Sequence, residues 1–356
     1  MGWEDPVMTD KHYAIVSPCL ATLTGAICLA MASAALAADK VRVGVGGSSS
    51  DAPLYLAREL GFFSDEGLDV DIINLDSGAK IMAPLGTGEL DVGAGALSVG
   101  FYNILGRGVK LKIVADRGHT DATSLYQTVF IRKDLVDSGR YKALRDLKGL
   151  RMGYAAAGVT SLSLMNEASK AAGIAFEDTT PVYMPFPNMV AAMQNKALDG
   201  AMLIEPQETQ IERLGIGVRM QNTNDFYPNQ QISVIFYSEK FAVEQKAVAL
   251  RFMKGWLRGV RAMLDSIEGG RIAPTAGKTL DILTRSLDMP ADILKAIYMN
   301  AVNASGDISR ASIDRDLAFF RAQGWVTDDV ALDKVIDLSF AQEANKQLGP
   351  YVKAVK

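Results

Sequence analysis

The fold is decided by residues 41–75, which read VRVGVGGSSSDAPLYLARELGFFSDEGLDVDIINL. Residues 41–45 are rich in valine and are typical of a buried strand, and a loop of glycine and serine follows them. Pro53 suits the first turn of a helix, where its missing N–H costs nothing, and this helix is expected to cover 54–63. A second strand is expected at 69–75. A strand, a helix and a strand at this spacing predict a parallel sheet covered by helices.

The same alternation continues along the chain and starts again near residue 150. Further strands are expected at 91–96, 111–115, 126–131, 150–155, 181–185, 201–204, 218–221 and 232–237, and further helices at 160–172 and 189–196. From Lys246 onward the pattern is helical only, with later helices expected at 276–287, 291–303, 309–323 and 332–344. A chain of 356 residues suits two domains rather than one core. We therefore expect an α/β protein of two doubly wound lobes, which the strands 126–131 and 232–237 join as crossovers.

The N-terminal segment differs from the rest of the chain. Lys11 precedes a stretch from Tyr13 to Ala37 that has no charged side chain and ends in the small-residue pattern Ala35-Leu36-Ala37. These features are typical of a cleavable secretory signal and predict a periplasmic protein. A retained membrane anchor is the alternative, and translation could start at Met1 or at Met8. The expected organisation is a signal peptide at 1–37, lobe I at 38–127, lobe II at 128–234, and the rest of lobe I with the C-terminal helices at 235–356.

Cysteine and histidine usage limits the chemistry. Both cysteines, Cys19 and Cys28, lie inside the predicted signal, and its removal also leaves His119 as the only histidine. A mature chain of this kind has no disulfide, no thiolate nucleophile and no cysteine or multi-histidine metal site, so we expect no metal and no cofactor. The 37 basic and 41 acidic residues are nearly balanced, which argues against a nucleic-acid partner.

Candidate ligand-binding residues follow the predicted strands. Ligands of open parallel sheets bind beyond the carboxyl ends of the strands, where helix N-termini offer free N–H groups. The small or polar residues at these places are Ser49, Ser50, Asp51, Ser77, Gly78, Ser98, Thr160 and Ser161. Each of them could instead be an ordinary helix cap.

Three further places carry candidates. Glu205 ends a predicted strand and could accept a hydrogen bond from a ligand, or cap the helix that begins near Pro206. Arg117, close to His119, could meet an anionic group or form a surface salt bridge. Phe186 and Asn188 could supply an apolar wall and a polar contact.

The residues 52–63 and 66–70 resemble the opening of the nitrate/sulfonate/taurine-type periplasmic substrate-binding proteins. Similar stretches occur at 85–93, 146–153 and 197–201 and at Glu205-Pro206. The resemblance implies a type II periplasmic-binding-protein fold, a solute held between the lobes, and an ABC permease in the membrane as partner. It carries over to Ser50, Ser77, Gly78, Ser98, Thr160, Ser161 and Glu205. Pro84 departs from the family pattern and predicts a late start or a kink in its helix.

The expected function is that of a monomeric solute receptor of an ABC importer, and not of an enzyme. The solute is expected to be a sulfonate, a carboxylate or aromatic acid, or a pyrimidine. Two alternatives remain open at this point. One is an enzyme on the same fold, of the pyrimidine-forming or lyase type, which would need His119, Glu205 or Asp51 as its acid or base. The other is a ligand sensor for a membrane signalling partner.

Overall fold

The structure is a computed structural model that describes residues 1–2, 37–75 and 78–354. The predicted signal peptide therefore lies almost wholly outside the described residues, as does Ser77. Residues 1–37 form a unit of their own, and the description below concerns residues from Ala38 onward. Among the described residues no helix has the length and apolar character that a membrane crossing needs.

The first of two five-stranded sheets has the order β2-β1-β3-β10-β4. Its strands are β1 (Asp39–Val45), β2 (Leu68–Asn74), β3 (Val92–Ala96), β4 (Leu111–His119) and β10 (Gln231–Ser238). β1 pairs in parallel with β2 and β3, whereas β10 runs antiparallel to both of its neighbours. The sheet is thus mixed: the other strands run parallel, as predicted, and β10, which was predicted as a crossover strand, runs antiparallel to its neighbours.

The second sheet has the order β7-β6-β8-β5-β9. Its strands are β5 (Gln127–Arg132), β6 (Arg151–Tyr154), β7 (Thr180–Tyr183), β8 (Gly200–Ile204) and β9 (Gly217–Asn222). β5 runs antiparallel to β8 and β9. The chain crosses between the sheets at 120–126 and 223–230, so each predicted crossover strand is the first strand after a crossing. β10 belongs to the first sheet from Gln231, slightly before the predicted return at 235.

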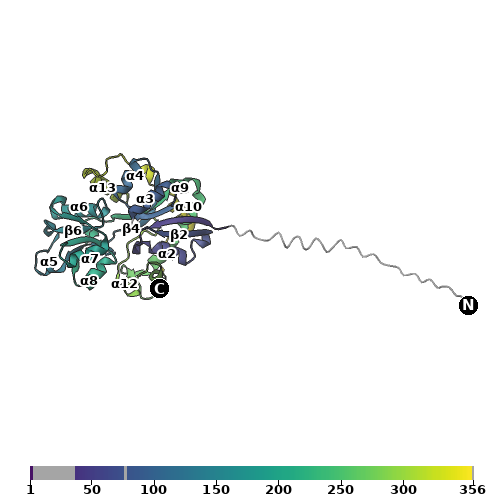
Figure 1. Ribbon diagram of the computed structural model, residues 1–356, viewed down its shortest axis with the longest axis horizontal. Coiled ribbons are helices and arrows are strands. Elements are labelled where there is room, and N and C mark those ends of the chain that lie inside the picture. The colour runs from purple at the N-terminus through teal and green to yellow at the C-terminus, as the bar shows by residue number, and fades with distance from the viewer. Residues whose placement is uncertain (3–36, 76–77, 355–356) are drawn as a thin grey trace. The chain divides into compact units, whose positions relative to one another are not determined.

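Helices cover both sheets (Figure 1). The first sheet carries α2 (Ala52–Glu59), α3 (Gly78–Thr87), α4 (Val99–Gly106), α9 (Glu239–Glu244), α10 (Lys246–Asp265), α11 (Gly277–Ser286), α12 (Ala291–Ala296), α13 (Arg310–Ala322), α14 (Leu332–Val335) and α15 (Ser339–Leu348), with a small hairpin of β11 (Ile267–Glu268) and β12 (Arg271–Ile272). The second sheet carries α5 (Lys133–Asp137), α6 (Thr160–Ala172), α7 (Phe186–Gln194) and α8 (Gln207–Arg213). We call each sheet with its helices the first half and the second half.

Three helices differ from their sequence-based expectation. The helix expected at 291–303 ends at Ala296, because the residues after it pair with other segments: Met299 donates its N–H to Gly270, and Ala301 bridges to His119. The helix expected at 332–344 is split into α14 and α15. α3 begins at Gly78 and continues through Pro84, so the predicted late start is not seen.

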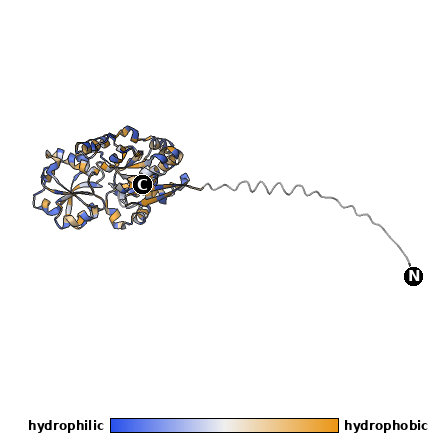
Figure 2. Ribbon diagram, turned by 45° about the horizontal axis from the view of Figure 1, so that its top comes forward, coloured by the Kyte–Doolittle hydropathy of each residue, from blue (hydrophilic) through white to orange (hydrophobic). Residues whose placement is uncertain are grey.

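The core of the first half is built on α10, which packs its apolar face on α2. Figure 2 shows that hydrophobic (orange) and hydrophilic (blue) residues alternate along the helices and strands, as expected where one face of an element is buried. Trp256 on the apolar face of α10 is fully buried. One turn later, Gly259 allows a close approach between the two helices: a Cβ added there would lie 2.2 Å from the Pro53 oxygen and 2.8 Å from the Ala57 Cβ. The absence of a side chain at Gly259 therefore fixes the position of α2.

Candidate functional site

A cavity of about 540 Å³ lies between the strand ends of the two halves. The first half contributes Gly46, Gly47, Ser48 and Ser50 after β1, the end of β3 with Ser98, and Arg117. The second half contributes Ala155, Ala156, Val159, Thr160 and Ser161 after β6, residues 185–187 after β7, and residues 204–207 after β8. The carboxyl ends of the parallel strands thus meet at one cavity, as expected for this kind of sheet.

Antiparallel strands also reach the cavity, but with their opposite ends. Gln127 at the start of β5 lies beside Ile204 at the end of β8, and Ser233 near the start of β10 lies beside Ala96 at the end of β3. Tyr126, Gln127, Ile232 and Ser233 line the cavity for this reason. These four residues precede or begin their strands, so the rule that ligands bind after parallel strands does not predict them.

Arg117 and Asp51 form a buried ion pair beside the cavity. The Arg117 Nη2 donates to Asp51 Oδ1 and, at 3.3 Å, to Ser48 Oγ, while the Ser48 N–H donates to Asp51 Oδ2 at 2.9 Å. Both side chains are almost fully buried, with exposures of 6% and 0%. The Arg117 Nε–H has no hydrogen-bond partner within the described part of the chain. The charge of the guanidinium is therefore neutralised by Asp51, and one of its N–H groups is left without an acceptor beside the cavity.

Hydroxyl and amide groups supply the other polar contacts. Ser50 Oγ lies 2.7 Å from Ser48 Oγ and 3.5 Å from the Tyr126 hydroxyl. Burial raises the pKa of Tyr126, so its hydroxyl keeps its proton and can donate. The Gln127 side chain is 5% exposed, and its Oε1 has no hydrogen-bond partner among the described residues. Two residues that line the cavity thus each carry a buried polar atom without a partner among the described residues: the Arg117 Nε–H, a donor, and Gln127 Oε1, an acceptor.

The starts of α4 and α6 touch each other across the division between the halves. Ser98 caps α4 by accepting the Phe101 N–H at 3.3 Å. The Val99 N–H donates to Gly158 O at 2.8 Å, and Ser98 forms an isolated β-bridge with Val159. Gly158 has φ +72° and no room for a Cβ, which would lie 2.7 Å from the Val99 Cβ. This backbone contact joins the two halves beside Thr160 and Ser161.

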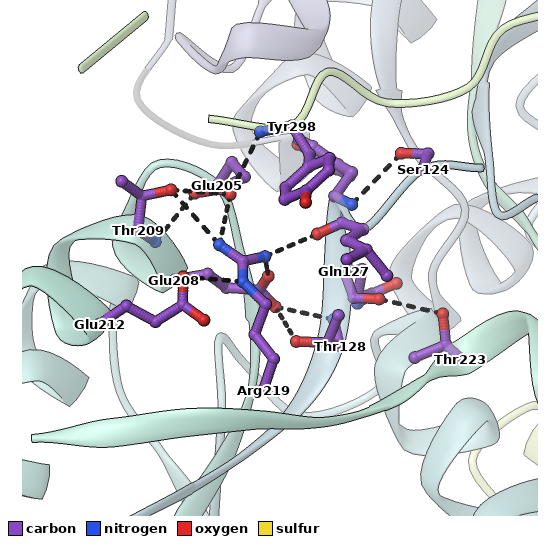
Figure 3. A network of polar contacts seen from close by, with 12 residues as sticks. Ser124, Gln127, Thr128, Glu205, Glu208, Thr209, Glu212, Arg219, Thr223 and Tyr298 are labelled. Carbon is purple, nitrogen blue, oxygen red and sulfur yellow. Dashed lines mark hydrogen bonds and ion pairs between the residues drawn. The ribbon is translucent and has the colours of Figure 1, made fainter. Parts of the chain in front are cut away.

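Glu205 is held by a network that Figure 3 shows from close by. Its carboxylate accepts the N–H and the hydroxyl of Thr209, at 3.0 and 2.9 Å, and the Arg219 Nη2 at 2.6 Å. The Tyr298 N–H, from the first half, donates to it at 3.2 Å. Glu205 therefore caps α8 and pairs with Arg219, and little of its hydrogen-bonding capacity is left for a ligand.

Arg219 pairs with two further carboxylates of α8. It donates to Glu208, and its Nε lies 3.1 Å from Glu212. Burial raises the pKa of Glu208 and the charge of Arg219 opposes that rise. The guanidinium also lies over the Tyr298 ring, 5.2 Å from its centroid. This network ties the second half to the segment around Tyr298.

The predicted site residues fall into three groups. Ser50, Ser98, Arg117, Thr160, Ser161, Phe186 and Glu205 line the cavity. Ser49 and Asp51 are buried in the turn behind it, Gly78 opens α3 outside the lining, and Asn188 is exposed and outside the lining. Ser77 lies outside the described residues. Asn188 lies in the first turn of α7 and is exposed, one residue beyond the last lining residue of this segment, Pro187.

Two sheets whose strand ends face one cavity define the periplasmic-binding-protein fold, and solved structures share it. The periplasmic aliphatic sulphonate binding protein SsuA from Escherichia coli matches with a TM-score of 0.67 and 16% identity, over 84% of this chain and 92% of that one. The ligand binding component of an ABC-type import system from Staphylococcus aureus also matches with a TM-score of 0.67 and 16% identity, over 86% of this chain and 99% of that one.

Within that class the chain belongs to the NMT1-like family, whose sequence model matches residues 34–271. A Brucella abortus binding protein is 27% identical over 226 residues, which are 61% of this chain and 65% of that protein. A 4-amino-5-hydroxymethyl-2-methylpyrimidine phosphate synthase of Aspergillus parasiticus is 28% identical over 131 residues, 37% of this chain and 35% of that one. The match thus spans under two thirds of the length of either relative.

Proposed function

We propose that the protein is an extracytoplasmic receptor that binds a small organic solute between its two halves and delivers it to an ABC permease. The observation that carries this proposal is the cavity of about 540 Å³, whose wall comes from the strand ends of both sheets. The import-system neighbour from Staphylococcus aureus and the binding-protein relative from Brucella abortus support it. The two halves are then lobes I and II, and a monomer is sufficient because one chain forms the whole cavity.

The size and chemistry of the cavity favour an organic solute over a bare inorganic ion. Organic ligands occupy pockets of about 300–1,000 Å³ with mostly apolar walls and a few polar groups. Phe186, Ile204 and Ile232 supply apolar wall, and Arg117 and Gln127 supply unsatisfied polar atoms. An apolar body with one polar end fits this wall, as in a sulfonate, an aromatic carboxylate or a pyrimidine.

Filling the cavity tests the proposal. Ala156 is exposed in the loop after β6 and lines the cavity, so Ala156→Trp puts an indole there without disturbing the core. We expect the purified mature wild type to gain melting temperature with at least one member of a panel of alkanesulfonates, aromatic carboxylates and aminopyrimidines. Ala156→Trp should lose this gain completely while the melting temperature of the free protein stays the same.

The neighbouring residue supplies the matched control. Ala157 is also exposed in the same loop and is not part of the lining, so Ala157→Trp should respond to solutes as the wild type does. Equal responses of all three proteins would contradict binding in this cavity. Failure of the wild type to respond to any member of the panel would count against the receptor function itself.

The charge of the solute can be determined with Asp51→Asn. This change removes the charge that neutralises Arg117, and an asparagine oxygen can still accept the Ser48 N–H. An anionic solute should then bind more tightly, on the order of tenfold for ~1.4 kcal/mol of added attraction. A neutral pyrimidine should bind with unchanged affinity. Isothermal calorimetry on both proteins measures the difference, and weaker binding of both solutes would show that Asp51 acts by shaping the turn.

Export through the signal at 1–37 completes the proposal. The A-x-A pattern before Ala38 supports cleavage there, and the mass of the mature protein from a periplasmic extract checks it.

An enzymatic role is the second candidate, because the Aspergillus parasiticus relative is named as a synthase. Against it, His119 does not line the cavity, and its Nδ1 lies 2.7 Å from Asp116. A receptor releases its solute chemically unchanged, which mass spectrometry of the denatured complex establishes.

A further inference from the structure

One helix, α13, packs against both halves. It contacts α4 and β10 of the first half and α6 of the second. Phe319 on α13 meets Phe176, just beyond α6, edge to face at 5.3 Å between ring centroids. Arg315 Nη1 lies 3.6 Å from Glu167 Oε2 on α6. The C-terminal part of the chain thus adds a side-chain connection between the halves to the two crossings and the backbone contact at Ser98.

Asp316 on α13 is a fully buried carboxyl at this connection. It accepts the Tyr227 hydroxyl at 2.6 Å, and both of its oxygens lie 3.4 Å from Gln230 Nε2. Tyr227 and Gln230 belong to the second crossing. Gln230 also ties that crossing to the first one, because its N–H donates to Thr120 Oγ1 at 2.8 Å and its carbonyl accepts the Thr120 N–H at 2.9 Å.

The side-chain amide of Gln230 also contacts a residue that lines the cavity. Gln230 Nε2 donates to Thr160 O at 3.0 Å, and Thr160 is the first residue of α6 and lines the cavity. The α6 helix has no side-chain cap of its own at this end. Gln230 therefore links a buried carboxyl and the first turn of α6 through its side chain, and the two crossings through its backbone.

We propose that Asp316 and Gln230 are positioning residues that couple the proton on a buried carboxyl to the packing of α6, and so to the ligand cavity. The coupling to solute binding rests on the proposed function of that cavity. Loss of the α6–α13 contact would let water reach the carboxyl and would free Thr160 from Gln230. The contact is therefore favoured when Asp316 is protonated and weakened when it is charged.

The environment of Asp316 places this change near neutral pH. Burial raises the pKa of Asp316 to about 7, and the hydrogen bonds from Tyr227 and Gln230 only partly oppose the rise. The groups that face the carboxyl are Glu167 and the Ser163 hydroxyl of α6, Tyr227 and Gln230 of the second crossing, Tyr102 of α4, and Arg315 of α13. A carboxyl exposed to water would titrate at about 4.

These two pKa values determine whether packing becomes stronger or weaker as the pH rises. Asp316 keeps its proton up to a higher pH when α6 and α13 are packed than when they are apart. The free energy that favours packing is therefore greatest at low pH, and it falls as the pH rises toward the pKa of the packed form. Below the pKa of the packed form, the equilibrium constant for packing falls about tenfold for each pH unit. Between pH 6 and pH 8 it should therefore fall about tenfold. Above pH 8 it should fall no further.

Hydrogen exchange on the mature chain without solute tests this. In the wild type we expect protection factors for amides in the first two turns of α6 to be about tenfold higher at pH 6 than at pH 8. Asp316→Asn cannot ionise, so protection should be high and equal at both pH values. Amides of α10 report global opening, which also exposes Asp316, so the change is assigned to the packing of α6 only if the α6 amides are less protected than those of α10.

Two variants complete the test. Asp314→Asn changes an exposed carboxylate on the same helix, which pairs with Arg310, and should follow the wild type. Tyr227→Phe removes a donor that favours the charged carboxyl, so the midpoint of the pH profile should move upward; this variant also tests the coupling if Asp316→Asn folds poorly. A flat wild-type profile, or a pH dependence that survives in Asp316→Asn, would overturn the proposal. Because no solute is present, these outcomes are independent of whether the cavity binds one.

Discussion

Arg219→Met is expected to lower the free energy of unfolding by about 3–5 kcal/mol, the usual cost of leaving buried charges without their partner. Glu205 and Glu208 are both fully buried, and Arg219 is the basic residue that pairs with each of them. Urea denaturation at pH 8 measures the loss. The loss should shrink at pH 5, because burial raises the pKa of Glu208, Arg219→Met removes the charge that opposes this rise, and the carboxyl takes up a proton as the pH falls.

An exposed arginine of the same half provides the control. Arg213 pairs with Asp292 at 2.7 Å, and the two side chains are 45% and 70% exposed. Arg213→Met should therefore cost only about 0–1 kcal/mol. A similar loss for both variants would mean that burial does not determine the value of the Arg219 network.

Gly259→Ala is expected to destabilise the protein by about 1–3 kcal/mol, the usual cost of overpacking a core. The expected sign is unusual, because alanine in a helix interior is normally favoured over glycine by about 1 kcal/mol. The new Cβ would meet the Pro53 oxygen and Ala57, both on α2. Urea denaturation again measures the loss, and since α2 follows the turn that carries Ser50, solute affinity should fall as well.

Gly277 is the matched control for this substitution. It also lies in a helix, α11, and a Cβ added there would meet nothing within 4 Å. Gly277→Ala should leave stability unchanged or raise it slightly. A stable Gly259→Ala protein would show that α2 and α10 can separate without cost.

Most strands could be predicted from the sequence because each is a short apolar run between turn residues. The strand expected at 41–45 is β1, and the helix expected at 160–172 is α6 without a shift at either end. Strand direction could not be predicted, because an apolar run reads alike whichever way it pairs. The antiparallel direction of β5 and β10 in their sheets was therefore not predicted.

The site was predictable to the same extent. Ser50, Ser98 and Thr160 follow parallel strands, and the strand-end rule alone places them at the cavity. Gln127 and Ser233 lie at or near the start of antiparallel strands. Because strand direction could not be predicted, neither could their position at the cavity. The ion pair of Asp51 with Arg117 could not be predicted, since a contact between residues so far apart in sequence leaves no local signal.

The packing of α13 on both halves has a consequence for how the molecule moves. The two crossings alone would allow one half to rotate widely relative to the other. A wide swing at α13 would expose Phe319 and Phe176 to water, whereas a small sliding of one helix past the other would not. We therefore expect α13 and α6 to slide past each other at this edge. Any larger separation of the two halves is expected at the opposite edge of the molecule.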